Sequence, residues 1–374
     1  MMTDRVRIQK TTSITAFLGA GASVPFGYPT TRTFLERFGA MLGPSDIKLA
    51  YLNSLRNLHR VKDIENVVEI LDSILKMEDY DARMLNSYSS IRNFLYDYPR
   101  SLDFGKKTDR TMNIPVLEGQ QRWTELTELS TKLRDSVEDF VFQQYESDTK
   151  QYSGIKDIMG GFFSVLKKHS SGKQAFEVFT TNYDNVVEDY CSEAGYACSL
   201  SEVNHEQQPR VGKISEEKFI LTKLHGALNW LGNKQTKEIR VIDVQTRVGR
   251  NARGRWNMNE YVLFGTKARL GEVELYDKLF SRLEKCLNET SICVVVGFRF
   301  RDSDINKIFR KALESNKTLR MLIVSNSPTN SLMNLINDRQ KLKSLQSEKR
   351  IIKLKCRFEK KEVVPAIDKI LSSL

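Results

Sequence analysis

Small residues that could cradle a phosphate follow the first apolar run of the chain. The segment Phe17 to Ser23, Phe-Leu-Gly-Ala-Gly-Ala-Ser, joins a predicted strand, Ser13 to Leu18, to a helix predicted from Thr30 to about Leu42. Such a turn leaves backbone N–H groups unpaired at the positive end of a helix, where they can hold a phosphate. Glycine lets that backbone approach a ligand closely. The turn favours a dinucleotide, although it is neither the full dinucleotide fingerprint nor a P-loop with its lysine.

Three further polar clusters also come directly after predicted strands. They are Thr181 to Asp184 after Phe176 to Thr180, His225-Gly226 after Phe219 to Leu224, and Gly297 to Asp302 after Ile292 to Val296. In an open α/β sheet, ligands bind beyond the carboxyl ends of the strands. The four clusters together therefore predict one ligand site along that edge.

The arrangement of apolar runs predicts the sheet that must carry these clusters. From residue 171 onward, short strands alternate with helices, which is typical of a parallel, doubly wound sheet. Two more strand and helix pairs follow, Leu319 to Ser325 with a helix from about Thr329, and Ile351 to Lys355 with Val363 to Leu371. The predicted fold class is α/β, with a doubly wound, mostly parallel, Rossmann-like sheet.

A long stretch after the first strand and helix has helical periodicity instead. Apolar residues recur at helical steps over Ile64 to Leu75 and over Leu126 to Val141, and the polar segment Pro99 to Glu118 predicts a loop. We therefore expect a helical insertion after the first strand–helix unit. The predicted α/β domain comprises residues 1–44 and 171–374, and the insertion comprises residues 45–170.

The chain is basic, with 58 Lys and Arg against 47 Asp and Glu and a formal net charge of +11. Two segments carry much of this excess, Lys341 to Lys361 and a loop that contains Arg247, Arg250, Arg253 and Arg255. Both could contact nucleic acid weakly. A solvated surface explains them more simply, and an anionic dinucleotide accounts for a basic site without any nucleic acid.

Cysteine and histidine spacing argues against a metal site. The five cysteines contain no Cys-x-x-Cys pair, and the four histidines have no metal-binding spacing. No apolar run reaches the length of a membrane span, the longest being Ile292 to Phe298. The charged first ten residues contain no secretory leader. We expect a cytoplasmic protein without a membrane partner.

Taken in order, the motifs resemble those of the sirtuin family. Gly-Ala-Gly-Ala-Ser, Thr-x-Asn-x-Asp and His-Gly occur in the sirtuin sequence order. More narrowly, Phe-Thr-Thr-Asn-Tyr-Asp, Leu-His-Gly and the late Gly-Phe-Arg-Phe-Arg-Asp are similar to those of bacterial sirtuin-like NAD-consuming effectors of antiviral defence. The motifs span residues 17–306, which is most of the chain.

The resemblance implies a role for each matching residue, with NAD as substrate and no metal. Asn182 would position the nicotinamide ribose or the attacking water, Asp184 would bind the nicotinamide carboxamide, and His225 would accept a proton. An imidazole suits that last role because its ordinary pKa is near neutrality. The remaining implied NAD contacts are Gly19, Ala20, Gly21, Ala22, Ser23, Pro29, Thr30, Arg32, Thr181, Gly297, Phe298, Arg299 and Asp302.

Each residue also has a purely structural interpretation. Asn182 and Asp184 could cap the helix that starts near Asn185, His225 could be a hydrogen-bonded turn histidine, and Arg299 could be surface charge. The clustering of motifs favours function for Asn182 and His225. Glu65, a position often acidic in the relatives, is explained equally well as a charge in the first turn of a helix.

The chain also departs from the protein-deacylating sirtuins. It lacks their four zinc-binding cysteines, and Thr30 and Thr31 stand where those enzymes have Asp and Phe. We therefore predict an NAD glycohydrolase that releases nicotinamide and ADP-ribose and depletes NAD in antiviral defence. The alternatives are an NAD-dependent deacylase, a non-catalytic NAD or ADP-ribose sensor, and a DNA-associated subunit. The resemblance further implies a homo-oligomer partnered with a ring-forming HerA-type ATPase.

Overall fold

The computed structural model describes residues 12–59, 61, 63–75, 116–146, 154–171, 175–201, 205–207, 218–233, 239–241, 258–262, 274–358 and 362–374. The chain divides into two compact units. One is formed by Met1–Tyr28 with Ser147–Leu374, and the other is Pro29–Glu146. The basic loop at residues 247–255 lies outside the described residues.

The first unit is built on an eight-stranded sheet with the order β11-β10-β9-β1-β2-β5-β3-β4. All neighbouring strands are parallel except β3 and β4. The strands are β1 (Ile14–Leu18), β2 (Phe176–Thr180), β3 (Ala197–Leu200), β4 (His205–Gln207), β5 (Lys218–Lys223), β9 (Ile292–Val296), β10 (Arg320–Ser325) and β11 (Ile351–Lys355). The prediction of a mostly parallel, doubly wound α/β sheet is confirmed. Every residue of β1 and β9 is buried, as expected for central strands covered on both faces.

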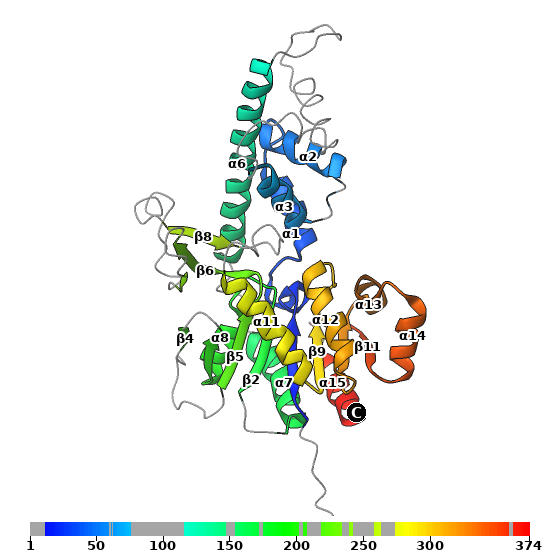
Figure 1. Ribbon diagram of the computed structural model, residues 1–374. Coiled ribbons are helices and arrows are strands. Elements are labelled where there is room, and N and C mark those ends of the chain that lie inside the picture. The colour runs from blue at the N-terminus through cyan, green and yellow to red at the C-terminus, as the bar shows by residue number, and fades with distance from the viewer. Residues whose placement is uncertain are drawn as a thin grey trace, which may run out of the picture. The chain divides into compact units, whose positions relative to one another are not determined.

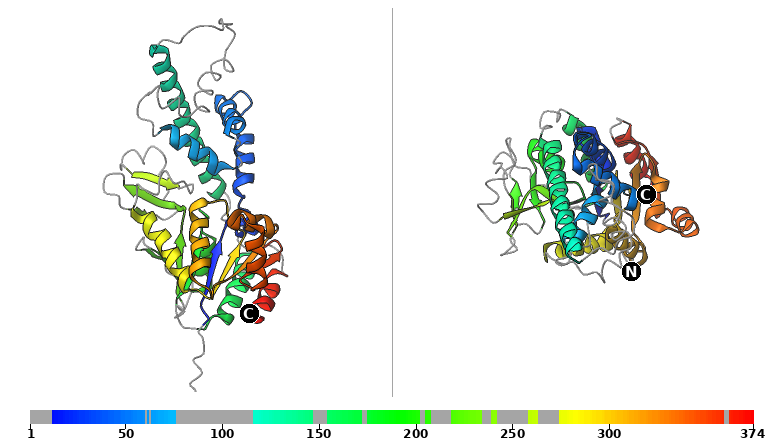
Figure 2. Two further views of the ribbon diagram at one scale, coloured as in Figure 1. Left: turned by 45° about the vertical axis from the view of Figure 1, so that its right-hand side comes forward. Right: turned by 90° about the horizontal axis from the view of Figure 1, so that it is seen from above.

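Helices cover both faces of this sheet (Figures 1 and 2). On one face, α11 and α12 pack on each other and share a hydrophobic core with side chains of β1, β9 and β10. On the other, α7 contacts β1, α8 and α15. The helices of this unit are α7 (Ile155–His169), α8 (Val186–Ala194), α11 (Glu274–Glu289), α12 (Ser303–Ser315), α13 (Pro328–Ile336), α14 (Arg339–Ser347) and α15 (Val363–Ser372).

A smaller antiparallel sheet with the order β7-β6-β8 was not predicted. Its strands are β6 (Gly226–Asn233), β7 (Ile239–Val241) and β8 (Met258–Val262). The sequence of β6, Gly-Ala-Leu-Asn-Trp-Leu-Gly-Asn, contains two glycines and two asparagines. These residue types are depleted in strands, so the pattern lacks a strand signal.

The second unit is helical and contains α1 (Thr31–Met41), α2 (Ile47–His59), α3 (Ile64–Leu75) and α6 (Val116–Glu146). The helices predicted from residue 30, over 64–75 and over 126–141 are confirmed. The predicted loop from Pro99 to Glu118 lies largely outside the described residues, and its last three residues belong to α6 instead. No helix among the described residues is both long and apolar enough to span a bilayer.

The two units begin and end at different residues from the predicted domains. The helix α1 belongs to the helical unit, whereas the prediction placed all of it with the sheet. The helix α7 belongs to the sheet unit, whereas the prediction placed it in the insertion. It does so because its apolar face packs against α8 and α15, with Phe163 stacked on Tyr190 of α8.

Candidate functional site

The four polar clusters begin level with one another at the carboxyl edge of the sheet. Leu18, the last residue of β1, pairs with Thr180 at the end of β2 and with Val296 at the end of β9. Thr180 in turn pairs with Lys223 at the end of β5. The predicted meeting of the clusters at one edge is therefore confirmed. Asn182 and His225 each lie two residues beyond a member of the paired Thr180 and Lys223, so they occupy adjacent loops.

The glycine turn is more closed than the sequence suggested. It forms two short 3-10 turns, Ala20–Ala22 and Val24–Phe26. The backbone N–H groups of Gly19 and Gly21 donate to the carbonyls of Val296 and Gly297, at 2.9 and 3.1 Å. Those of Ala22 and Ser23 donate within the turn. The expectation that these N–H groups are unpaired at the start of a helix is therefore wrong for four of the five residues.

Close packing against the β9 loop explains why this turn needs glycine. A Cβ atom on Gly21 would lie 2.7 Å from Cα of Gly297, and one on Gly19 would lie 2.7 Å from Cα of Phe298. Gly297 itself has φ of 66°, a left-handed conformation that favours glycine. The rings of Phe298 and Phe17 pack together with their centroids 4.9 Å apart. Both Gly297 and Phe298 thus have a structural task in addition to their implied NAD contacts.

Asn182 ties the end of β2 to the glycine turn. Its Nδ2 donates to the carbonyl of Gly19 at 3.0 Å and to Oγ of Ser23 at 2.8 Å, and its backbone N–H donates to Oγ1 of Thr180. The side chain is buried, as is that of Ser23. Because both amide protons have acceptors within the protein, Oδ1 is the atom of Asn182 that remains to contact a ligand. The neighbouring Thr181 uses its backbone N–H to bond Leu18.

Asp184 is a buried carboxyl group beside the same serine. Burial raises its pKa, and this effect outweighs the hydrogen bond from Ser23, the charge of Lys223 and the bond from Val186, all of which lower it. The Val186 N–H donates to Oδ1 at 3.1 Å, although the N-cap residue of α8 is Asn185 and not Asp184. Ser23 therefore joins Asn182 and Asp184 into one hydrogen-bonded cluster.

Lys223 and Glu188 are two functional candidates that the sequence did not reveal, and Lys223 contacts this cluster. The Lys223 ammonium donates to the backbone carbonyl of Asp184 at 2.7 Å, to Oδ1 of Asn185 at 3.1 Å and to Oε1 of Glu188 at 2.6 Å. The side chain of Lys223 is 0% exposed and that of Glu188 is 6% exposed. The available signal was a lysine at the carboxyl end of a mostly apolar strand segment, two residues before His225.

A small cavity lies beside Ser23, Asn182 and Asp184. It is lined by Leu18, Ala22, Ser23, Met159, Thr180, Asn182, Asp184, Val186, Val187 and Glu188, and its empty space, including what is open to solvent, is ≈ 240 Å³. The lining includes the polar side chains of Ser23, Asn182, Asp184 and Glu188, so the cavity suits a polar group of a ligand. Among the described residues, no group of three or more His, Cys, Asp or Glu side chains is arranged to hold a metal.

His225 is paired with a carboxylate from another loop. Its Nε2 lies 3.0 Å from Oδ2 of Asp302, and both side chains are buried. Burial, the strongest single influence, raises the pKa of Asp302. The hydrogen bond and charge of His225 and the N–H groups of Ile305 and Asp304 act in the opposite direction, and the net effect is a lowered pKa. This task differs from the direct NAD contact that the resemblance implied for Asp302.

The remaining predicted residues are less closely tied to the cluster. Arg299 is exposed, and its backbone carbonyl accepts a hydrogen bond from Asn334. Thr30 is the N-cap of α1 in the helical unit, where its side chain accepts from the Thr33 N–H. Pro29 and the exposed Arg32, which pairs with Glu36 at 3.5 Å, belong to that unit too. The structure thus joins Ser23, Asn182 and Asp184 directly and His225 to Asp302.

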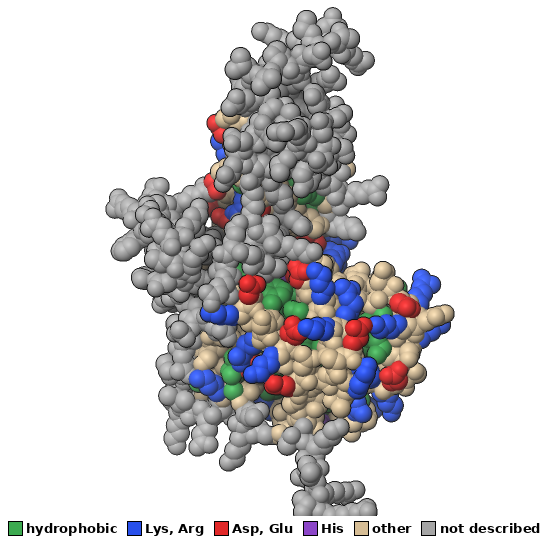
Figure 3. Space-filling model, in the orientation of Figure 1, with side chains coloured by type: hydrophobic (Ala, Val, Ile, Leu, Met, Phe, Trp, Pro, Cys, Tyr) green, Lys and Arg blue, Asp and Glu red, His purple; other side chains and the backbone are tan. Residues whose placement is uncertain are grey.

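The predicted basic patch is only partly described. On the face shown in Figure 3, Lys and Arg side chains of the sheet unit are interspersed with acidic ones. Within the segment 341–361, Lys341 pairs with Glu314 at 2.8 Å. At least one lysine of the segment is therefore paired with an acidic side chain of the sheet unit.

The fold and its polar edge define an α/β protein with a buried amide, carboxyl and histidine site at the carboxyl ends of parallel strands. Residues 177–351, just under half of the chain, match the family model described as SIR2-like domain. No curated protein sequence matches the chain.

Several solved structures of Sir2 proteins are similar to the chain over nearly its whole length. A mutant Sir2 homologue in complex with ADP-ribose is 9% identical, with 97% of this chain and 93% of that chain covered and a TM-score of 0.43. A Sir2 homologue in complex with NAD is 10% identical, with coverages of 97% and 91% and a TM-score of 0.42. At these identities and scores the likeness carries no information about activity.

Proposed function

We propose that the protein hydrolyses the nicotinamide–ribose bond of NAD. The observation that carries the proposal is the cluster in which Ser23 joins Asn182 to Asp184 beside a buried cavity, with His225 on the adjacent strand end. The match of residues 177–351 to the SIR2-like domain supports the same substrate. The resemblance of the motifs to NAD-consuming effectors supports it further.

The proposed reaction is NAD⁺ + H₂O → nicotinamide + ADP-ribose + H⁺. The C–N bond to C1′ of the ribose breaks, and its electron pair passes to the pyridinium nitrogen, which leaves as neutral nicotinamide. Water forms the new bond to C1′ and loses a proton. Since the leaving group is already activated, the protein must mainly orient the reactants and accept that proton.

Each residue of the site has a task that its contacts permit. Oδ1 of Asn182 would hold the water or a ribose hydroxyl, because its Nδ2 is committed to Gly19 and Ser23. Asp184 would contact the carboxamide of nicotinamide in the cavity that it lines. His225 would accept the proton. The sequence supports hydrolysis over deacylation, since the five cysteines provide no Cys-x-x-Cys pair for the zinc site of the deacylating sirtuins.

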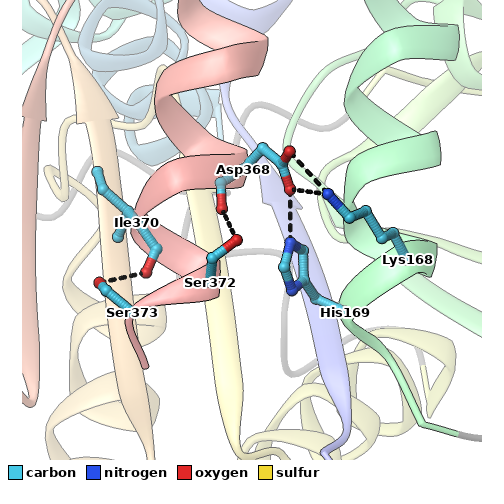
Figure 4. A network of polar contacts seen from close by, with 6 residues as sticks. All are labelled: Lys168, His169, Asp368, Ile370, Ser372 and Ser373. Atoms are coloured by element: carbon cyan, nitrogen blue, oxygen red, sulfur yellow. Dashed lines mark hydrogen bonds and ion pairs between the residues drawn. The ribbon is translucent and has the colours of Figure 1, made fainter.

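The test is nicotinamide release from NAD by the purified full chain. Asn182→Ala and His225→Gln are each expected to reduce the rate by about 10²-fold or more. Asn330→Ala, on an exposed asparagine of α13, and His169→Gln are matched controls. His169 is the last residue of α7, and it and Lys168 contact Asp368 of α15 (Figure 4). Release that survives both site substitutions contradicts the proposal, and acyl-lysine turnover would replace it with deacylation.

We infer the biological role from the motif resemblance alone. It is depletion of the cytoplasmic NAD pool in antiviral defence by an oligomeric protein that works with a HerA-type ATPase. Cells that express the wild-type chain should lose NAD after phage infection, and cells that express Asn182→Ala should not. Equal NAD levels in the two strains would contradict the defence role without contradicting NAD hydrolysis by the purified protein.

A further inference from the structure

The two oxygens of Asp302 perform different tasks. Oδ2 lies 3.0 Å from Nε2 of His225. Oδ1 accepts the N–H groups of Asp304 and Ile305, at 2.8 and 2.9 Å, and so caps the first turn of α12. A carboxylate held at one oxygen by two backbone donors cannot rotate freely, so its other oxygen is presented to the histidine in a fixed position.

The loop that carries Asp302 is itself held in place by two asparagines. Phe300 has φ of 52°, in the left-handed region that non-glycine residues seldom adopt. Its carbonyl accepts a hydrogen bond of 2.8 Å from Nδ2 of Asn306 in α12. The carbonyl of Arg299 accepts one of 2.8 Å from Nδ2 of Asn334 in α13. The chain thus maintains an unfavourable backbone conformation just before Asp302.

We propose that Asp302 is the positioning residue of His225, which it holds in the tautomer that carries its proton on Nε2. The lone pair is then on Nδ1, a buried ring nitrogen that would accept the proton released in the reaction. The inference deepens the proposed NAD hydrolysis and rests on it. Asp302 acts through the histidine and does not contact the substrate.

Both side chains of the His225–Asp302 pair are buried, which makes a charge on the histidine costly without a partner. The side chain of His225 is 3% exposed and that of Asp302 is 9% exposed, so an imidazolium formed there has little water to stabilise it. A carboxylate at 3.0 Å offsets that cost. On α12, the described charges Asp304 and Lys307 pair with each other at 2.8 Å. Asp302 is thus a carboxylate in direct contact with the histidine ring.

The discriminating substitution is Asp302→Asn. Asparagine is as good an N-cap as aspartate, so Oδ1 still accepts the N–H groups of Asp304 and Ile305. The group opposite the histidine becomes an N–H donor, which requires an unprotonated Nε2 and moves the ring proton to Nδ1. We expect kcat to fall by about 10²- to 10⁴-fold, with a smaller change in the KM for NAD and a displaced pH profile.

The tautomer is measured by ¹⁵N NMR of the full chain labelled at histidine. The protein has four histidines, and His225→Gln assigns the signal of His225. The wild type should show a protonated Nε2, and Asp302→Asn a protonated Nδ1. Asp338→Asn is the matched control, since Asp338 caps α14 in the same way through the N–H groups of Gln340 and Lys341 and is expected to leave both readouts unchanged.

The outcomes separate this inference from the proposed function. If the wild type releases nicotinamide and Asp302→Asn does so equally fast, or if the His225 tautomer is the same in both, the positioning role is wrong. If the wild type releases none, the proposed function fails, while the NMR spectra still report whether Asp302 sets the ring. Asp302→Ser, which retains a capping oxygen without a carboxylate, replaces Asp302→Asn should that variant fail to fold, and it should lose activity similarly.

Discussion

Replacing the buried Lys223 should destabilise the sheet unit more than any change at an exposed lysine. The ammonium group has three acceptors, and its charged partner Glu188 is nearly as buried as the lysine. Lys223→Met removes the cation and leaves the Glu188 carboxylate without its partner. Breaking a buried ion pair in this way costs about 3–5 kcal/mol. Because the lysine also holds the carbonyl of Asp184, we expect a raised KM for NAD.

The assay is urea unfolding followed by tryptophan fluorescence. The chain has three tryptophans, and Trp230 is buried in the sheet unit at 1% exposure. Trp123→Phe and Trp256→Phe provide a background in which Trp230 alone reports. In that background, Lys223→Met should lower the midpoint for the sheet unit. Lys168→Met is the control, because Lys168 is 60% exposed in its pair with Asp368 and exposed pairs contribute little.

A double substitution separates the charge effect from lost packing. Glu188→Gln removes the second charge while keeping the side-chain volume, so Lys223→Met with Glu188→Gln should recover most of the loss. A Lys223→Met protein destabilised by less than about 1 kcal/mol would refute the reasoning. So would a double variant no more stable than the single one.

Three further outcomes are expected. Gly297→Ala should destabilise the sheet unit by more than about 1 kcal/mol in thermal unfolding, because its Cβ would lie 2.5 Å from the backbone of Gly21 at φ of 66°; an unchanged Tm would contradict this. Hydrogen bonds from His169 and Lys168 lower the pKa of Asp368, although burial raises it. The contact between α7 and α15 therefore stabilises the folded state fully above the ordinary pKa of 3.8. That stabilisation is lost as the pH falls through the lower pKa of the folded state. Asp368→Asn should flatten that acid dependence, measured by Tm from pH 2 to 6. Arg134→Met should destabilise the helical unit by about 3–5 kcal/mol, seen as faster hydrogen exchange in α3 and α6, because Arg134 pairs with the buried Asp72 at 2.5 Å and with the partly buried Glu138. Equal exchange rates would show the network to be dispensable.

The sheet could be predicted because its central strands are short, continuous apolar runs with polar residues at one end. Ile292 to Val296 and Phe176 to Thr180 occur in the structure with the predicted bounds. Because the strands of such a sheet are parallel, their carboxyl ends could be placed at one edge before it was known which strands are neighbours. The antiparallel strand β6 gave no such signal, because its glycines and asparagines resemble a loop.

The pairs that complete the site could not be predicted, because sequence distance hides them. His225 and Asp302 are 77 residues apart, and Lys223 lies 35 residues from Glu188. Asp302 was associated with NAD because it stands in the late motif. Only the structure shows that its two oxygens already serve His225 and α12.

The glycine turn carries less weight for ligand binding than its composition suggested. Its glycines are explained by the approach of the Gly297 loop, since a Cβ on either Gly19 or Gly21 would overlap that backbone. Four of the five N–H groups that a phosphate could use are bonded to Val296, to Gly297 or within the turn. Ser23 links the turn to the site, because its side chain reaches both Asn182 and Asp184. If Ser23 is the reason the turn matters, Ser23→Ala should impair nicotinamide release more than Ala20→Ser at the half-buried neighbour.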